Sequence, residues 1–314
     1  MSHEHHIPVP TIAIAAISGA MIGVQSRANG SLAILLGNSR QAALISFGSG
    51  FLLLIVMSLL SARLRDGLRA VRAAVVRRDL PRWQLLAGMI GAWFVIVQTV
   101  AVPITGVAVF SVATIAGQSA ASLVVDRLGL RSGVSHRITA RRALTAFVTV
   151  VAVAVSVADR VEGSGGWITL LAFVVGGAVA VQRALNAHIT DYSNHSYATT
   201  WLNFATGVAL LLVANFSLGA QPLAALPGPD RWFDYTGGVI GVVYIALASV
   251  LVQRLGVLMF TATSVGGQLL GSLAIDLAFP TPGVTIAWNV YAGVLLSCVG
   301  ILAGTRRPRT APTA

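Results

Sequence analysis

Ten runs of apolar residues, each about as long as a lipid bilayer is thick, dominate this sequence. A helix rises about 1.5 Å per residue, so roughly 20 apolar residues cross a hydrocarbon core of about 30 Å. Lipid cannot hydrogen-bond an exposed backbone, and the sequence lacks the alternating pattern of barrel strands. The sequence therefore predicts an all-α polytopic membrane protein with ten transmembrane helices, near residues 8–27, 41–61, 83–101, 105–125, 143–158, 167–187, 198–218, 235–252, 256–278 and 284–303.

The composition excludes several other classes of protein. Hydrophobic residues make up 56% of the chain and charged residues only 10%, whereas soluble domains carry about 25% charged residues. A chain this apolar is not disordered, and it has no Gly-x-y period of collagen. The single cysteine, Cys298, cannot support a disulfide scaffold and is interpreted as a small buried side chain.

The arginines predict how the chain is oriented. All 21 basic residues are arginines, and they concentrate in two segments interpreted as loops, 62–82 and 126–142. Placing the N-terminus in the cytoplasm leaves only Arg27, Arg40, Arg160 and Arg231 outside. The positive-inside rule thus predicts that both termini are cytoplasmic. We interpret the arginines as topology signals with contacts to lipid headgroups, and expect no nucleic-acid partner.

The first ten residues show no feature of a removable signal. They lack a basic stretch and a small-residue cleavage site, so the first apolar run is expected to be retained as a span. His3, Glu4, His5 and His6 are interpreted as a solvated end rather than as metal ligands.

Two halves of the sequence resemble each other. At an offset of 157, residues 19–54 match residues 176–211, including the pairs Gln25/Gln182 and Asn29/Asn186. At an offset of 150, residues 88–126 match residues 238–276, with shared features that include Gly117/Gly267, Gln118/Gln268 and Asp126/Asp276. Biased composition does not explain paired Gln, Asn and Asp residues.

The duplication predicts an inverted architecture. We expect a first five-helix membrane repeat over residues 1–160 and a second over residues 161–314. Because five is odd, the second repeat enters the membrane in the opposite direction, as in many secondary transporters. Two such halves have two equivalent states, each open to one side, which is what alternating access requires.

Several motifs then resemble a known family. The stretches GVQSRANGSL (residues 23–32) and ALISFGSG (residues 43–50), with weaker echoes AVQRALN (residues 180–186) and NFATG (residues 203–207), resemble the YdcZ-like branch of the drug/metabolite transporter superfamily. The resemblance covers nearly the whole chain in two copies. It implies a multi-pass protein of the bacterial cytoplasmic (plasma) membrane with ten helices, which exports small molecules; it supplies no substrate.

The chain departs from small exporters of the same superfamily at one point. Those exporters use a membrane-embedded Glu for proton coupling, whereas here Asp126 and Asp276 come last in their spans and no carboxylate lies mid-span. Proton antiport through a central carboxylate is therefore in doubt, and uniport or coupling to another ion stays open.

Polar side chains within the apolar runs are the candidates for a substrate pathway, because such groups are costly in lipid. Gln25 and Asn29 share one helix face, as do Gln182 and Asn186, and both pairs can serve neutral or zwitterionic substrates or simply join helices. The complete set of candidate pathway residues is Gln25, Asn29, Trp93, Gln118, Gln182, Asn186, Asn203, Tyr244 and Gln268.

Aromatic residues allow two interpretations as well. Trp93 and Phe94 align with Val243 and Tyr244, and rings at these positions either line a cavity or pack between helices. Four tryptophans near the ends of the predicted spans are interpreted as anchors at the membrane interface: Trp83, Trp167, Trp232 and Trp288.

The sequence offers little support for an enzyme. No histidine lies inside a predicted span, and Walker A, His-Glu-x-x-His and paired-cysteine motifs are absent. We therefore expect no catalytic residues, no cofactor and no metal. His188, Asp191 and His195 have spacing compatible with zinc, but they lie in a segment interpreted as a solvated connection.

Two functions remain in view. The first is a secondary-active or facilitative transporter that moves a small organic solute, as an exporter, by alternating access. The second is a non-transporting membrane scaffold or lipid-binding subunit. The expected partners are a small-molecule substrate and the lipid bilayer, and a homodimer is left open.

Overall fold

The computed structural model describes residues 9–128, 139–156, 158–159, 164–217, 228–255, 257–281 and 283–305. All regular structure in these ranges is helical, as the sequence predicts. Ten α-helices and two short 3₁₀ helices are defined there: α1 (Val9–Leu36), α2 (Ser39–Leu60), α3 (Ala62–Val76), η1 (Arg82–Leu86), α4 (Ala87–Leu128), α5 (Ala140–Ser156), α6 (Ser164–Ser193), α7 (Ser196–Ser217), η2 (Pro229–Tyr235), α8 (Gly237–Leu255), α9 (Val257–Ala278) and α10 (Trp288–Thr305).

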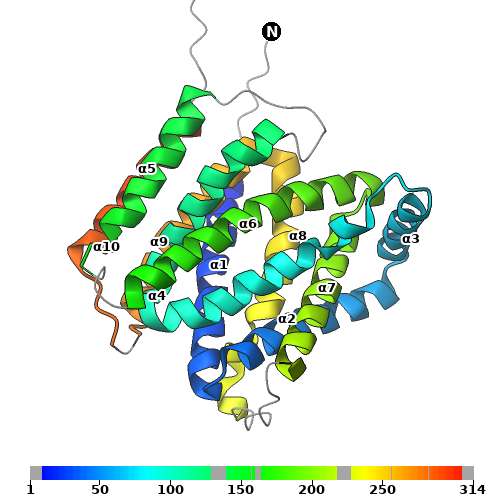
Figure 1. Cartoon of the computed structure of the whole chain (residues 1–314), viewed down its shortest axis with the longest axis horizontal. Helices are drawn as coiled ribbons and strands as arrows, with labels where there is room; N and C mark the ends of the chain where they lie inside the picture. The colour runs from blue at the N-terminus through cyan, green and yellow to red at the C-terminus, as the bar shows by residue number, and fades with distance from the viewer. Residues whose placement is uncertain are drawn as a thin grey trace, which may run out of the picture.

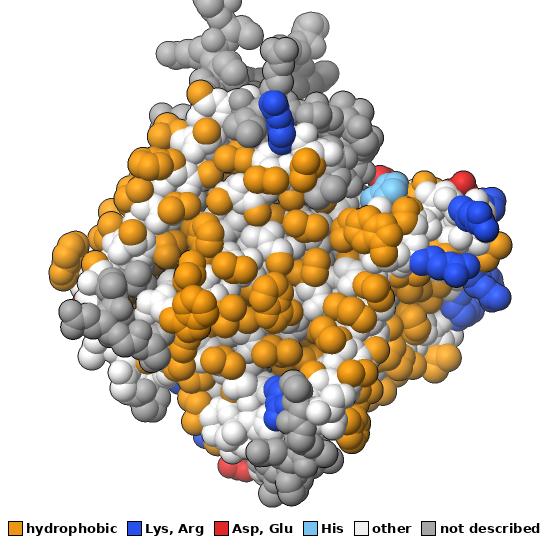
Figure 2. Space-filling view, in the orientation of Figure 1, with side chains coloured by type: hydrophobic (Ala, Val, Ile, Leu, Met, Phe, Trp, Pro, Cys, Tyr) orange, Lys and Arg blue, Asp and Glu red, His pale blue; other side chains and the backbone are white. Residues whose placement is uncertain are grey.

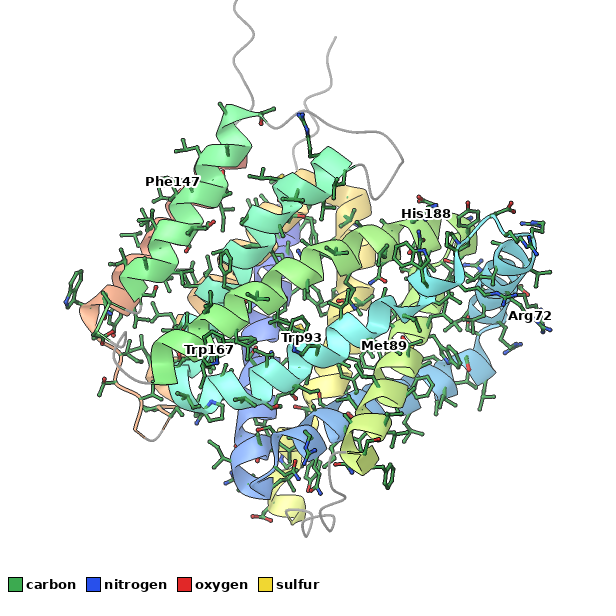
Figure 3. All side chains as sticks on the ribbon, viewed as in Figure 1. Arg72, Met89, Trp93, Phe147, Trp167 and His188 are labelled. Atoms are coloured by element: carbon green, nitrogen blue, oxygen red, sulfur yellow. The ribbon has the colours of Figure 1, made fainter. Side chains whose placement is uncertain are left out.

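Five helical segments of the described chain are long and apolar enough to cross a membrane. They are Val9–Leu36, Ser39–Leu60, Arg82–Val125, Gly165–Ser193 and Ser196–Ser217. Apolar side chains cover much of the face seen in Figure 2, including exposed Phe147 on α5 and Trp167 on α6 (Figure 3). A surface of this kind is suited to lipid rather than to water.

Helix α4 contains two of the predicted spans, separated by a break at Gly106. This glycine has φ of 82° and ψ of 168°, a left-handed conformation that an L side chain rarely adopts. Figure 1 shows the first part of α4 running away from the α3 end and the second part turning back from the break. The predicted hairpin is therefore present, although the helix is nearly continuous.

Asp276 of α9 holds this break in place. Its carboxylate accepts hydrogen bonds from the backbone N–H groups of Val107 (3.0 Å) and Ala108 (2.7 Å), which begin the second part of α4. A carboxylate at a helix N-terminus satisfies unpaired donors and complements the helix dipole. Asp276 is 4% exposed, so this acidic residue has a structural partner at the end of its span.

The segment 62–82 contains a helix where the sequence analysis placed a loop. In α3, Leu64, Gly67, Val71 and Ala74 are buried, while arginines such as Arg72 point away from the bundle (Figure 3). The sequence indicated a loop here because α3 is too short to span a bilayer and is apolar on only one side.

Glycines set the contact between α1 and α9. A Cβ atom on Gly19 would lie 1.8 Å from the carbonyl oxygen of Ser264, and a Cβ atom on Gly267 would lie 2.0 Å from that of Ala16. Neither position has room for a side chain, so the two backbones touch. Small residues allow such close approach in lipid, where helix association depends on packing rather than on the hydrophobic effect.

The contact between α4 and α6 repeats this arrangement. A Cβ atom on Gly176 would lie 2.2 Å from the carbonyl oxygen of Thr114, and a Cβ atom on Gly117 would lie 1.9 Å from that of Phe173. These four residues are the counterparts, at the two sequence offsets of 157 and 150, of the four residues that join α1 to α9. The contacts thus indicate an approximate two-fold relation between the halves of the bundle.

The four tryptophans interpreted as interface anchors are all exposed. Trp83, Trp167, Trp232 and Trp288 have exposed fractions between 57% and 75%. Trp167 lies near the start of α6, on the face of the bundle seen in Figure 3. Exposure leaves these indole side chains accessible to lipid headgroups, and their role as interface anchors stays a prediction.

Candidate functional site

A central cavity of about 380 Å³ lies between α1, α2, α4, α6, α7, α8 and α9. This volume falls in the range of pockets that hold small organic molecules. Seven of the nine candidate pathway residues line it: Gln25, Gln118, Gln182, Asn186, Asn203, Tyr244 and Gln268. The tertiary structure thus brings side chains from both repeats to one place.

The other two candidates lie elsewhere. Asn29 is fully buried beside the cavity and is bonded to Gln98, so it does not line the cavity. Trp93 is 38% exposed and lies on the face of α4 seen in Figure 3, whereas its neighbour Phe94 contributes to the lining. Adjacent residues on a helix point about 100° apart, which explains how one ring faces inward while the other does not.

Three side chains of the second repeat form a connected network at the cavity wall, which we call the second-repeat polar cluster. Gln182 donates to Asn203 Oδ1 (3.2 Å), and Asn203 donates to Asn186 Oδ1 (2.9 Å) and to the backbone oxygen of Thr199 (2.9 Å). Gln182, Asn186 and Asn203 are all partly exposed. Their remaining donors and acceptors can bind a solute.

The cavity extends from this cluster toward the ends of α6 and α7. Thr190 and Ser196 line it there. The same helix ends pack on α3, because a Cβ atom on Gly67 would lie within 3.1 Å of both Ala198 and His195. The part of the cavity that Thr190 and Ser196 line therefore lies beside the arginine-rich helix.

A second polar network, in the first repeat, is buried; it contains Asn29, the counterpart of Asn186, whereas Gln25, the counterpart of Gln182, lines the cavity. Asn29 donates to Gln98 Oε1 (2.6 Å), and Gln98 donates to Ser26 Oγ (2.7 Å). These three residues, the first-repeat polar cluster, are each 0% exposed. The Oδ1 atom of Asn29 and the Oγ atom of Ser46 are buried without a hydrogen-bond partner, which is a costly arrangement.

Gln98 is a residue of this cluster that the sequence analysis missed. Its signal was an amide deep inside the apolar run 83–101, which is unusual in a membrane span. Pairing between the repeats does not reveal Gln98, because its counterpart is Ala248. The counterpart of Asn203 is likewise Ser46, so the two polar clusters are built from different residues.

Paired glycines place two of the amides against neighbouring helices. A Cβ atom on Gly91 would lie 2.8 Å from Gln182 Nε2, and a Cβ atom on Gly241 would lie 3.3 Å from Gln25 Nε2. Both pairs are related by the repeat offsets. The absence of a side chain at these glycines leaves room for each amide to lie in the lining.

Aromatic rings supply the apolar part of the lining. Phe47 and Phe204, a pair matched by the repeat, have ring centroids 4.9 Å apart, and both border the cavity. Phe94, whose ring lies 5.5 Å from that of Phe110, and Tyr244 border it as well. Both interpretations of the aromatic residues therefore hold for these rings, because they pack between helices and also line the cavity.

The zinc-compatible spacing does not form a metal site within the described residues, where no group of three His, Cys, Asp or Glu side chains could hold an ion. His188 lies on α6 (Figure 3), and its Nδ1 atom is 2.7 Å from Gln84 Oε1. The segment interpreted as a solvated connection is therefore largely helical. His3, Glu4, His5 and His6 lie outside the described residues.

Comparison with known families shows which family the chain belongs to. A family model described as "Putative inner membrane exporter, YdcZ" matches residues 10–155 and again residues 167–303. The chain belongs to the YdcZ family. The double match shows that this YdcZ chain contains two repeats, and the family is one of inner membrane transporters rather than of enzymes. A search of the curated proteins found no match.

Proposed function

We propose that this YdcZ protein is a carrier that exports a small organic solute by alternating access between two inverted five-helix repeats. The observation that carries the proposal is the unequal state of the two polar clusters. The second-repeat cluster borders a cavity and is partly exposed, while the first-repeat cluster is buried and hydrogen-bonded. One gate is then open and its counterpart is closed.

The proposal fixes the orientation of the open state. Ten membrane crossings result if each part of α4 crosses once and α3 lies at the surface, and both termini are then cytoplasmic. We take the cavity to open at the end beside arginine-rich α3, which is cytoplasmic by the positive-inside rule. The structure would thus be the inward-open state, with Ser26, Asn29 and Gln98 forming the closed outer gate.

The two-fold contacts support a rocking motion. The α1–α9 and α4–α6 contacts are glycine-based and equivalent, so each can act as a rigid pair that moves as a unit. Exchange of the two conformations between the repeats would open the first-repeat cluster to the outside and bury the second-repeat cluster. No proton-coupling carboxylate lines the described cavity, which leaves facilitative transport or coupling to another ion.

Cysteine accessibility tests this proposal without knowledge of the substrate. In a Cys298→Ala background, Thr190→Cys should react with an impermeant maleimide in inside-out vesicles and not in intact cells. Ser26→Cys should react slowly, and only from the outside. When both cysteines are present, prior labelling at position 190 should abolish reaction at position 26, because a bulky adduct holds the cavity open to the cytoplasm.

The alternatives give different results. A channel would let both positions react from both sides, and a static scaffold or lipid-binding subunit would leave Ser26→Cys unreactive throughout. Flux in proteoliposomes, measured across a panel of metabolites and drugs, gives an independent check. Alanine at Gln182 or Asn186 should reduce flux in the carrier, whereas in a scaffold it would lower only the stability.

A further inference from the structure

We propose that the solute carries a carboxylate on a small apolar body, and that Arg183 binds this carboxylate when the cavity is open to the cytoplasm. This inference rests on the proposed carrier function and deepens it. It follows from the charge of the lining. Among the described residues that line the cavity, Arg183 is the one charged side chain, and no carboxylate accompanies it.

Arg183 is available to a ligand. It is exposed, and the hydrogen bonds and ion pairs found for the described residues do not include it. Its guanidinium offers donors that match a carboxylate in two parallel hydrogen bonds. Arg183 follows Gln182 directly on α6, so a bound carboxylate would also lie near the amide donors of the second-repeat polar cluster.

The remaining lining fits the body of such a solute. Phe47, Phe94, Phe204 and Tyr244 present rings, while the amides and hydroxyls present neutral donors and acceptors. An organic cation would be repelled by Arg183 and would find no described acidic partner in the lining.

The positive charge at position 183 is present in only one of the two repeats. The counterpart of Arg183 at the offset of 157 is Ser26, which is buried in the first-repeat polar cluster and accepts from Gln98. In the outward-open state a solute would therefore meet a serine where the inward-open state offers an arginine. Capture from the cytoplasm and release outside follow from this difference, which favours export of an anion.

Matched ligands test the charge preference. Binding of benzoate, benzamide and benzylamine, and of hexanoate, hexanamide and hexylamine, should be measured by calorimetry on the purified full-length protein in nanodiscs. We expect each carboxylate to bind more tightly than its amide and each amine to bind most weakly. Loss of a charge-assisted hydrogen bond should weaken carboxylate binding about 10- to 100-fold in Arg183→Gln, with no change for the amides.

Two further variants distinguish a carboxylate-binding role of Arg183 from the general effect of arginines on membrane topology. Arg183→Lys keeps the charge and should retain most of the carboxylate binding. Arg254→Gln removes an exposed arginine that does not line the cavity and should change nothing. Equal effects of Arg183→Gln and Arg254→Gln would overturn the proposal, because both would then act only through the overall charge.

The outcomes also separate this proposal from the carrier function. A series in which no carboxylate binds more tightly than its amide, including one in which nothing binds, overturns the anion proposal. If cysteine accessibility still alternates between positions 190 and 26 in that case, the carrier function stands. If accessibility is fixed, both proposals fail.

Discussion

Two adjacent glycines of α9 provide a sharp test of the helix contacts. A Cβ atom on Gly267 would lie 2.0 Å from the backbone oxygen of Ala16, whereas a Cβ atom on Gly266 would meet nothing within 4 Å. We expect Gly267→Ala to destabilise the protein and Gly266→Ala to be neutral. The two variants make the same chemical change one residue apart, so general effects of alanine cancel in the comparison.

The expected destabilisation by Gly267→Ala follows from the short distance between the new Cβ atom and the backbone oxygen of Ala16. Real Cβ atoms stay more than 3.0 Å from other heavy atoms, so α1 and α9 must separate to accept the new methyl group. Because the obstacle is backbone, it cannot move aside as a flexible side chain would. Overpacking of this kind typically costs about 1–3 kcal/mol. Gly266→Ala instead replaces a poor helix former and can gain up to about 1 kcal/mol.

The corresponding residues of the first repeat support both expectations, that Gly266→Ala is neutral and that Gly267→Ala is destabilising. The counterpart of Gly266 is Ala116, so the first half of the chain already carries the proposed substitution. The counterpart of Gly267 is Gly117, where a Cβ atom would lie 1.9 Å from the backbone oxygen of Phe173. Gly117→Ala should therefore be as damaging as Gly267→Ala.

Thermal unfolding in detergent, followed by tryptophan fluorescence at a fixed scan rate, measures these differences. A loss of 1–3 kcal/mol should lower the apparent midpoint by roughly 2–10 °C. A fixed scan rate is needed because membrane proteins of this size commonly unfold irreversibly. Equal midpoints for Gly266→Ala and Gly267→Ala would refute the close α1–α9 contact.

Three other predictions address the break, the surface helix and the outer gate. Asp276→Ala should destabilise the protein by about 2–4 kcal/mol in the same assay, since two buried N–H groups lose their acceptor, and Asp276→Asn should cost less. Gly67→Leu should push α3 away from Ala198, so trypsin should cleave at the arginines of α3 faster than in the wild type. Gln98→Ala should loosen the first-repeat polar cluster and speed labelling of Ser26→Cys from the outside; an unchanged labelling rate would count against the gate.

Much of the site could be predicted because polar residues are rare in apolar spans. Gln25 and Gln182 were identified from their pairing between the repeats, and both line the cavity. Asn29 was identified in the same way but does not line the cavity, because it is buried and donates to Gln98, a contact between helices that the sequence does not show. Gln98 was missed because it has no polar counterpart at the repeat offset.

The sequence by itself determined the helical class, the membrane setting and the two repeats. These follow from local physics, since apolar length decides whether a helix enters lipid and paired residues at fixed offsets record a duplication. Only the tertiary structure decided that α3 is a helix, that Asp276 holds the break at Gly106, and that one polar cluster borders a cavity while the other is buried. Such features depend on contacts between residues far apart in the chain, which the spacing of residues along the sequence does not specify.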